Sequence, residues 1–380
     1  MKSSRHVIRI KTRRIVVSLL VSSHQTNFLT IHTLDTGYGI MKRFFGTLFT
    51  TSILAFSMSL GLVADAQVNL QLQGKVDIDG SSTVYPISEA AAASFTKKFP
   101  NVNVNVGVSG TGGGFKRFTT GATDISDASR PIKDSEFAAA KAAGVAFYEL
   151  PVAYDGLTIV VHKDNDWVDH LTVDEIKKIF NAETAAKSWS AVRAGWPDNE
   201  IKIFAPGTDS GTFDYFKEVV AGKEGSLRDD MSTSEDDNVL VTGVSGSPNA
   251  IGFFGVAYYE ENKEKLKAVP VVNPELGQPV SPTSVTIENG TYAPFSRPLF
   301  IYVNAKSLRR PEVKQFVTFY ITNAALMAKQ TGYVALPPSI YQEVTDRCRK
   351  RKVGTHYLTP EHNKRSGPVT EVYKAENLVN

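Results

Sequence analysis

The sequence contains almost no cysteine and no large excess of charge of either sign. Cys348 is the single cysteine in 380 residues, so neither an intramolecular disulfide nor a cysteine-based metal cluster can form. The seven histidines include no HExxH motif and no pair spaced four residues apart, which argues against a metal site. A formal net charge of +3, without aromatic residues interleaved in a basic stripe, does not indicate nucleic-acid binding. We therefore expect no metal, no cofactor and no nucleic-acid partner.

The length and composition are those of a globular protein with more than one domain. A chain of 380 residues is too long for one small core and suits two domains with processed ends. The shares of hydrophobic and charged residues, 42% and 21%, are ordinary for such a protein.

The segment that begins at Met41 has the pattern of a secretory signal. Lys42 and Arg43 provide the charged start, an apolar run spans 44–63, and 64–66 read Ala-Asp-Ala, an A-x-A cleavage site. A membrane anchor is the alternative, but small and hydroxyl-bearing residues crowd the run. We predict a signal peptide over residues 41–66, with residues 1–40 not part of the true protein. Because no cysteine lies at the cleavage point, we expect a periplasmic protein without a lipid anchor.

Strands and helices are predicted to alternate in the remaining chain. Residues 101–108 alternate strictly between polar and apolar, the signature of a strand, and lead into the glycine-rich stretch 107–118, "GVSGTGGGFKRF". Such β-loop-α units predict a parallel sheet that binds ligands at the carboxyl ends of its strands. The apolar stretch 145–165 is predicted to form a pair of strands. Residues 346–380, with the basic run "RCRKRK", are predicted to form a solvated polar tail.

Four loops combine small residues, hydroxyl groups and a following helix: 79–86, 108–116, 127–131 and 206–213. Oriented backbone N–H groups and a helix N-terminus stabilise an anion without mobile counterions. Arg130 adds a planar set of donors that matches the geometry of an oxyanion. The four loops together predict an anion site.

Two kinds of phosphate chemistry fail on the details of these loops. A nucleotide-binding P-loop needs G-x-x-x-x-G-K-[ST], whereas Phe115 separates Gly114 from Lys116. A serine hydrolase could use Ser210 in "TDSGT", but the sequence has no G-x-S-x-G turn and no recognisable histidine base. A free anion that is bound without reaction fits the loops better.

Six stretches resemble, in order and spacing, the phosphate-binding proteins of bacterial phosphate ABC transporters: "DGSSTVYPISEA", "GVSGTGGGFKRF", "DISDASRPI", "GTDSGTFDYF", "NAIGFFGVAYY" and "FSRPLFIYV". The resemblance covers about residues 74–345. It implies an α/β fold of the two-lobed periplasmic binding protein type (type II-like), with two α/β domains joined by hinge strands. Lobe 1 would comprise 74–155 and 290–345, and lobe 2 would comprise 156–289.

The same resemblance implies the activity and the site. The protein would bind inorganic phosphate with high affinity, deliver it to the membrane permease as a monomer, and catalyse no reaction. The implied phosphate-binding residues are Ser82, Thr83, Thr111, Gly112, Ser129, Arg130, Asp209, Ser210, Gly211 and Thr212.

Two departures from the family pattern bear on selectivity. Many relatives have an acidic residue where Ser129 stands, which accepts the proton of hydrogen phosphate, and many have an arginine where Pro206 stands. Arg130 would replace the arginine's charge, and Asp209 or Asp155 would replace the carboxylate. Sulfate has no proton to donate, so a carboxylate in the cleft would disfavour it. Two alternatives stay open: a binder of another tetrahedral oxyanion such as sulfate, and a secreted phosphatase or hydrolase that uses Ser210.

Overall fold

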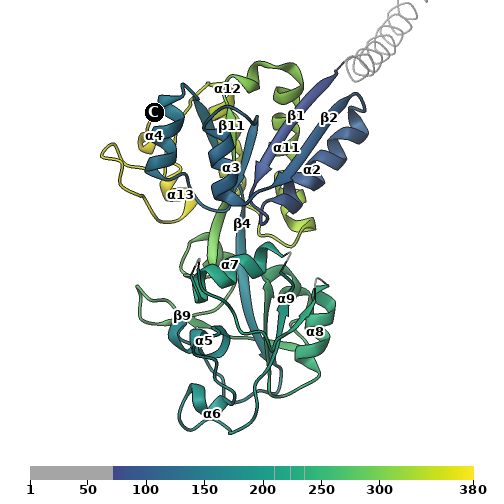
Figure 1. Ribbon diagram of the computed structural model, residues 1–380, viewed down its shortest axis with the longest axis vertical. Helices are drawn as coiled ribbons and strands as arrows, with labels where there is room; N and C mark the ends of the chain where they lie inside the picture. Colours follow the sequence, from purple (N-terminus) through teal and green to yellow (C-terminus); the bar gives the residue numbers. More distant parts are fainter. Residues whose placement is uncertain (1–71, 209, 223, 235) are drawn as a thin grey trace, which may run out of the picture. The chain divides into compact units, whose positions relative to one another are not determined.

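The structure is a computed structural model that describes residues 72–208, 210–222, 224–234 and 236–380 (Figure 1). The predicted start at Met41, the signal peptide over 41–66 and the candidate ligand Asp209 lie outside the described residues. The described residues belong to one unit by their internal contacts. None of their helices has both the length and the apolar character that a membrane crossing requires.

One large mixed sheet organises the described chain. Its strands follow the order β2-β1-β3-β11-β4-β7-β5-β6, and β8 pairs with β4 beside this path. A separate antiparallel pair consists of β9 and β10. The strands are β1 Gly74–Gly80, β2 Val102–Val108, β3 Ile125–Ala128, β4 Phe147–His162, β5 Lys202–Pro206, β6 Ser232–Ser234, β7 Ala250–Gly255, β8 Leu266–Ala268, β9 Val271–Val272, β10 Pro279–Val280 and β11 Ser296–Asn304.

Helices connect most of these strands, as the alternating pattern predicted. Thr172 caps the start of α5, because its hydroxyl accepts a hydrogen bond from the Glu175 N–H. The helices are α2 Tyr85–Lys98, α3 Gly110–Phe118, α4 Asp134–Ala142, α5 Val173–Phe180, α6 Trp189–Val192, α7 Gly211–Val220, α8 Asp237–Ser245, α9 Val256–Asn262, α10 Ser284–Glu288, α11 Pro311–Gln330, α12 Pro338–Arg349 and α13 Val369–Val372, with short 3₁₀ turns η1 Ser307–Arg309 and η2 Ala375–Asn377.

Two groups of parallel strands form the two lobes of the fold. In lobe 1, β1 pairs in parallel with β2 and β3. In lobe 2, β5 pairs in parallel with β6 and β7. The predicted α/β architecture is confirmed, and the two long strands β4 and β11 add antiparallel pairing between the groups.

Strand β4 passes from one lobe to the other. The prediction of a strand pair over 145–165 is wrong, because Phe147–His162 forms one continuous strand. Residues up to Gly156 pair with β11, whereas Leu157 and the residues after it pair with β7. An unbroken apolar run cannot distinguish one long buried strand from two short ones, since periodicity is absent from both.

The glycine-rich stretch is a helix for most of its length. Helix α3 begins at Gly110, whereas the sequence predicted a loop over 108–116. Helix propensity disfavours glycine, but tertiary packing decides here. A Cβ at Gly114 would lie 2.6 Å from Gly80 Cα, so only glycine lets α3 approach β1 this closely.

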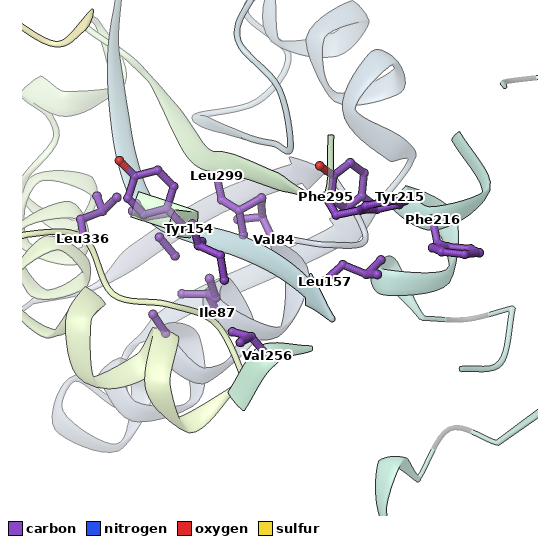
Figure 2. Packing of buried hydrophobic residues seen from close by; sticks show 14 of the residues in the cluster. Val84, Ile87, Tyr154, Leu157, Tyr215, Phe216, Val256, Phe295, Leu299 and Leu336 are labelled. Carbon is purple, nitrogen blue, oxygen red and sulfur yellow. The ribbon is translucent and has the colours of Figure 1, made fainter. Parts of the chain in front are cut away.

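The main hydrophobic core extends along β4 into both lobes. Figure 2 shows Tyr154 and Leu157 of β4 among residues of lobe 1, such as Val84, and of lobe 2, such as Phe216. Near the crossing, Tyr215 and Phe216 of α7 lie close to Phe295, which precedes β11. The crossing is therefore packed on the same core that stabilises each lobe.

The prediction of a solvated tail over 346–380 is wrong, because this segment packs on lobe 1. Tyr357 and Val372 belong to a buried cluster with residues of α3, α4 and β11. Figure 1 accordingly draws α13 and the C-terminus close to α4. The tail looked polar because its apolar residues are few and show no regular spacing.

Arg347, in the basic run of this segment, is buried rather than solvated. Its guanidinium donates to the carbonyl groups of Lys352 and Gly354. The nearby Glu149 carboxylate accepts hydrogen bonds from the Thr355 hydroxyl and the His356 N–H. Burial alone would raise the pKa of Glu149, but the hydrogen bond from His356 and the charge of Arg347 hold it below its usual value. This polar network fastens the C-terminal segment to β4.

Candidate functional site

A cavity of ≈ 360 Å³ lies where the two lobes meet. Lobe 1 lines it with the loop after β1, the first turn of α3 and the loop after β3, while lobe 2 lines it with α7. Strand β11 contributes one residue. The lining residues are Ser81, Ser82, Thr83, Gly110, Thr111, Gly112, Ser129, Arg130, Lys133, Glu136, Asp214, Tyr215, Lys217, Glu218, Gly222 and Arg297.

The lobe 1 wall presents hydroxyl and amide groups to this cavity. Thr111 and Ser129 approach within 3.0 Å through their hydroxyl oxygens, and the Ser129 N–H donates to Thr111 Oγ1 at 3.1 Å. Gly110 and Gly112 belong to the first turn of α3, whose N–H groups have no acceptor within the helix. The positive end of the helix dipole adds to these donors. The wall therefore suits an oxyanion.

The lobe 2 wall touches lobe 1 directly. The Thr83 hydroxyl donates to the Gly211 carbonyl at 3.3 Å, and the Ser82 hydroxyl donates to the Asp214 carboxylate at 3.1 Å. A Cβ at Gly211 would lie 2.5 Å from Thr83 Cα, so the two backbones are in contact. The lobes are closed on each other in this structure.

Six of the predicted site residues line one cavity: Ser82, Thr83, Thr111, Gly112, Ser129 and Arg130. Of the last loop, Ser210, Gly211 and Thr212 are not among the described residues that line it. Ser210 accepts a hydrogen bond from the Thr212 N–H and so caps α7, and Gly211 contacts Thr83. Asp209 lies outside the described residues. The ligand roles of all these residues stay predictions.

Arg130 is held by a carboxylate on the next helix. Its Nη1 and Nη2 donate to the two carboxylate oxygens of Glu136 at 2.9 and 2.8 Å. Glu136 also accepts from the Lys133 N–H and thereby caps the start of α4. The paired contacts fix the plane of the guanidinium at the cavity wall.

Arg297 also lines the cavity, although it was not among the predicted site residues. It lies on β11 directly opposite Asp155 of β4, and its Nε donates to that carboxylate at 3.3 Å. Its Nη2 donates to the Thr83 hydroxyl at 3.0 Å, and its guanidinium lies over the Tyr215 ring, 3.6 Å from the centroid. A signal existed in "FSRPLFIYV", because a charged residue within an apolar strand needs a partner.

Asp155, one of the two candidate proton acceptors, is buried behind Arg297 and does not line the cavity. Burial raises the pKa of its carboxyl above the usual value, and the Arg297 charge acts in the opposite direction. Among the described residues, the carboxylates that line the cavity are Glu136, Asp214 and Glu218. Glu136 is occupied by Arg130, and Asp214 is the carboxylate that also contacts lobe 1.

A second buried carboxyl lies immediately behind the lobe 1 wall. The Asp127 carbonyl accepts from the Ser81 N–H at 3.0 Å, and its Oδ1 accepts from the Ser88 hydroxyl. Its Oδ2 is buried without a hydrogen-bond partner. Burial raises the pKa of Asp127 to about 8, and the charge of Asp79 acts in the same direction. Asp127 stands in the stretch "DISDASRPI" but was not among the predicted site residues.

In the part of the chain that the structure describes, no group of histidine, cysteine and acidic residues could hold a metal ion. The described lining of the cavity instead includes the cationic side chains of Arg130, Lys133, Lys217 and Arg297 beside carboxylates. This donor set suits an anion that keeps its place by hydrogen bonds.

Comparison with known proteins identifies the family of this chain. Residues 66–324 match the PBP superfamily domain. The chain is 46% identical to Protein SphX of Synechococcus elongatus over 328 residues, which cover 86% of this chain and 95% of that protein. It is 41% identical to the phosphate-binding protein PstS of Staphylococcus haemolyticus, over 73% of this chain and 86% of that protein.

Solved structures agree with these relatives. A possible phosphate binding protein from Planctomyces limnophilus is 44% identical and superposes with a TM-score of 0.72, over 74% of this chain and 99% of that chain. An ABC-type phosphate transport receptor from Vibrio cholerae is 25% identical, with a TM-score of 0.54 over 69% of this chain and all (100%) of that chain. The chain therefore belongs to the PBP superfamily, a family of substrate-binding proteins, among the relatives of PstS and SphX.

Proposed function

We propose that this protein binds one inorganic phosphate in the cavity between its lobes and delivers it to the membrane permease of a phosphate ABC transporter. The names of its relatives support the ligand and the transport role. The observation that carries the proposal is the cavity itself. Helix-terminal amides, hydroxyls and two fixed arginines from lobe 1 and β11 face a wall of lobe 2 that closes over them.

This arrangement replaces the hydration of an anion by oriented donors. The donors come from rigid strand ends and a helix terminus, so little reorganisation accompanies binding. Closure excludes water and strengthens each hydrogen bond to the anion. Ser82, Thr83, Thr111, Gly112, Ser129 and Arg130 are the lobe 1 contacts that we propose, and Asp209, Ser210, Gly211 and Thr212 are those that we propose from lobe 2.

Selectivity for phosphate over sulfate needs a carboxylate that accepts the phosphate proton. We assign this role to Asp214, because it lines the cavity and reaches across to Ser82. A sulfate oxygen at the same place would meet the carboxylate without a proton between them, which is unfavourable. Asp155 faces Arg297 instead and would act through that arginine.

Binding without reaction fits the site better than hydrolysis. The Ser210 hydroxyl accepts from the Thr212 N–H and starts α7, a capping role. No histidine stands among the described residues that line the cavity, so a phosphate ester bound there would meet no base of the kind that activates a serine. We therefore propose no catalytic role for the protein.

The remaining parts of the proposal concern location and assembly. We propose that residues 41–66 direct the chain to the periplasm, that lobe 1 comprises 74–155 and 290–345, and that lobe 2 comprises 156–289. The protein would act as a monomer, because one chain supplies both walls of the cavity.

Calorimetric titration of the purified protein with phosphate, and then with sulfate, tests the proposal. We expect saturable binding of one phosphate per chain and at least tenfold weaker binding of sulfate. Tight sulfate binding with no response to phosphate would refute the proposed ligand. Turnover of a phosphate ester that Ser210→Ala abolishes would instead establish a hydrolase.

A further inference from the structure

Arg297 makes contact with both lobes and with the strand that connects them. Its partners are Thr83 of lobe 1, Tyr215 of lobe 2 and Asp155 of β4, and we name these four residues the Arg297 bridge. The side chain of Arg297 is 13% exposed, and that of Asp155 is 1% exposed. A buried charge in this position must be compensated, and the bridge supplies that compensation from three directions.

The hydrogen bonds of Arg297 leave part of its donor capacity toward the cavity. A guanidinium has five N–H groups. In the described part of the chain, one N–H at Nε bonds Asp155 and one at Nη2 bonds Thr83, while Nη1 makes no hydrogen bond to protein. Since Arg297 lines the cavity beside Ser82 and Thr83, these remaining donors are available to an anion held there.

The Arg297 bridge also links the remaining N–H donors of Arg297 to closure of the two lobes. Thr83 belongs to lobe 1 and Tyr215 to lobe 2, so the lobes cannot separate without breaking at least one of their contacts with Arg297. Tyr215 is fixed in turn, because its hydroxyl donates to the Pro294 carbonyl just before β11. Figure 2 shows Tyr215 beside Phe295 and Leu157 at this point. The ring is therefore presented to Arg297 by packing on both sides of the crossing.

We propose that Arg297 is a second anion-binding arginine that couples occupancy of the cavity to closure of the lobes, with Asp155 as its positioning residue. This inference rests on the proposed function, because it concerns the same anion. An anion that accepts hydrogen bonds from the remaining N–H groups holds the Arg297 guanidinium in one plane. In that plane the guanidinium also contacts Thr83 and Tyr215. Without the anion, the bridge alone stabilises the closed form.

Phosphate titration and stopped-flow dissociation of the full chain test the bridge through matched variants. Arg297→Lys keeps the charge but loses the planar set of donors, and we expect its phosphate affinity to fall about 10- to 100-fold. Tyr215→Leu removes the ring, and we expect about 2- to 30-fold faster phosphate dissociation with an association rate within threefold of wild type. Arg309→Lys, an exposed arginine away from the cavity, is the matched control and should bind like wild type.

Asp155 is tested by a double-mutant cycle, which separates positioning from a structural role. We expect Asp155→Asn to weaken phosphate binding about 3- to 30-fold in the wild-type background and by less than twofold in the Arg297→Gln background. Equal losses in both backgrounds would overturn the positioning role. Small-angle scattering should show that wild type contracts on adding phosphate, whereas Arg297→Gln contracts less.

Separate outcomes bear on the inference and on the proposed function. If wild type binds phosphate and the Arg297→Lys and Tyr215→Leu variants match its affinity and dissociation rate within twofold, the bridge is refuted and the function stands. If wild type binds sulfate and not phosphate, the proposed ligand is wrong, and the variants are then compared with sulfate. If wild type binds neither anion, both proposals fail. Thermal unfolding of each variant identifies any that has lost its fold.

Discussion

Replacement of Gly211 by alanine should hold the lobes apart while leaving each lobe intact. The added Cβ would lie 2.5 Å from Thr83 Cα and 2.7 Å from Thr83 N. Non-bonded carbon atoms prefer about 3.5–4.0 Å, and both Thr83 atoms are backbone, so neither can rotate away. Within lobe 2 the change is harmless, since Gly211 begins α7 and alanine is the better helix former.

The expected loss of affinity follows from the contacts that closure makes. Separation would break the Thr83–Gly211 and Ser82–Asp214 hydrogen bonds, each worth about 1 kcal/mol. It would also break one contact of the Arg297 bridge, worth about 1 kcal/mol for the guanidinium on the Tyr215 ring. A total near 3 kcal/mol corresponds to about 100- to 200-fold weaker phosphate binding, at 1.4 kcal/mol for each factor of ten.

Calorimetry with phosphate, scattering and thermal unfolding together test this reasoning. Gly211→Ala should bind about 100-fold more weakly and stay extended at saturating phosphate, with a melting temperature no lower than that of wild type without ligand. Gly246→Ala is the control, because the same methyl group is added at the end of α8, where it meets the Thr242 carbonyl at 3.1 Å, away from the cavity. An affinity of Gly211→Ala within threefold of wild type would show that closure does not need this contact.

Three further predictions concern buried or facing charges. Burial raises the pKa of Asp127 from 3.8 to about 8, so the folded state keeps a proton that the unfolded state releases. Wild type should therefore lose about 1.4 kcal/mol of stability per pH unit between pH 5 and 7 relative to Asp127→Asn, and less per unit as the pH approaches 8. A stability difference between the two proteins that stays constant across this range in urea unfolding would contradict it. Asp214→Asn should reduce the ratio of phosphate affinity to sulfate affinity about tenfold, as measured by calorimetry. An unchanged ratio would show that Asp214 is not the proton acceptor. Arg347→Ala should destabilise the protein by about 3–5 kcal/mol, since it leaves Glu149 and several carbonyl groups buried without their cation. Arg349 is exposed, so Arg349→Ala should change stability by less than about 0.5 kcal/mol in the same assay.

The sequence predicted local elements better than their assembly. The alternation in 101–108 predicted β2 almost at its observed ends, because this signal is local. The single strand β4 and the packing of 346–380 on lobe 1 were missed. Both depend on contacts between distant parts of the chain, such as Arg347 with Glu149, and no local pattern encodes these.

The convergence of Thr111, Ser129 and Arg130 on one cavity could be predicted, since each residue follows a strand of one parallel sheet. The carboxyl ends of such strands meet at one edge of the sheet, so the segments that follow them are expected to converge there. Arg297 could not be predicted in this way, because it does not follow a strand of that parallel sheet. It comes from an antiparallel strand far along the chain, and its neighbour Asp155 became apparent only through the register of β11 against β4.

Arg130 and Arg297, two arginines that line the cavity, are each paired with a carboxylate, and the charges of the site explain why. Arg130 is paired with Glu136 and Arg297 with Asp155, so each guanidinium brings its own compensating carboxylate. A pair of this kind presents directed N–H groups while its net charge is zero. Burying an unpaired arginine between the lobes would disfavour closure before the anion arrives, because the charge would lose its hydration. With both charges balanced in advance, the closed form can be reached at low cost, and the anion is recognised by the direction of its hydrogen bonds rather than by attraction to a bare charge.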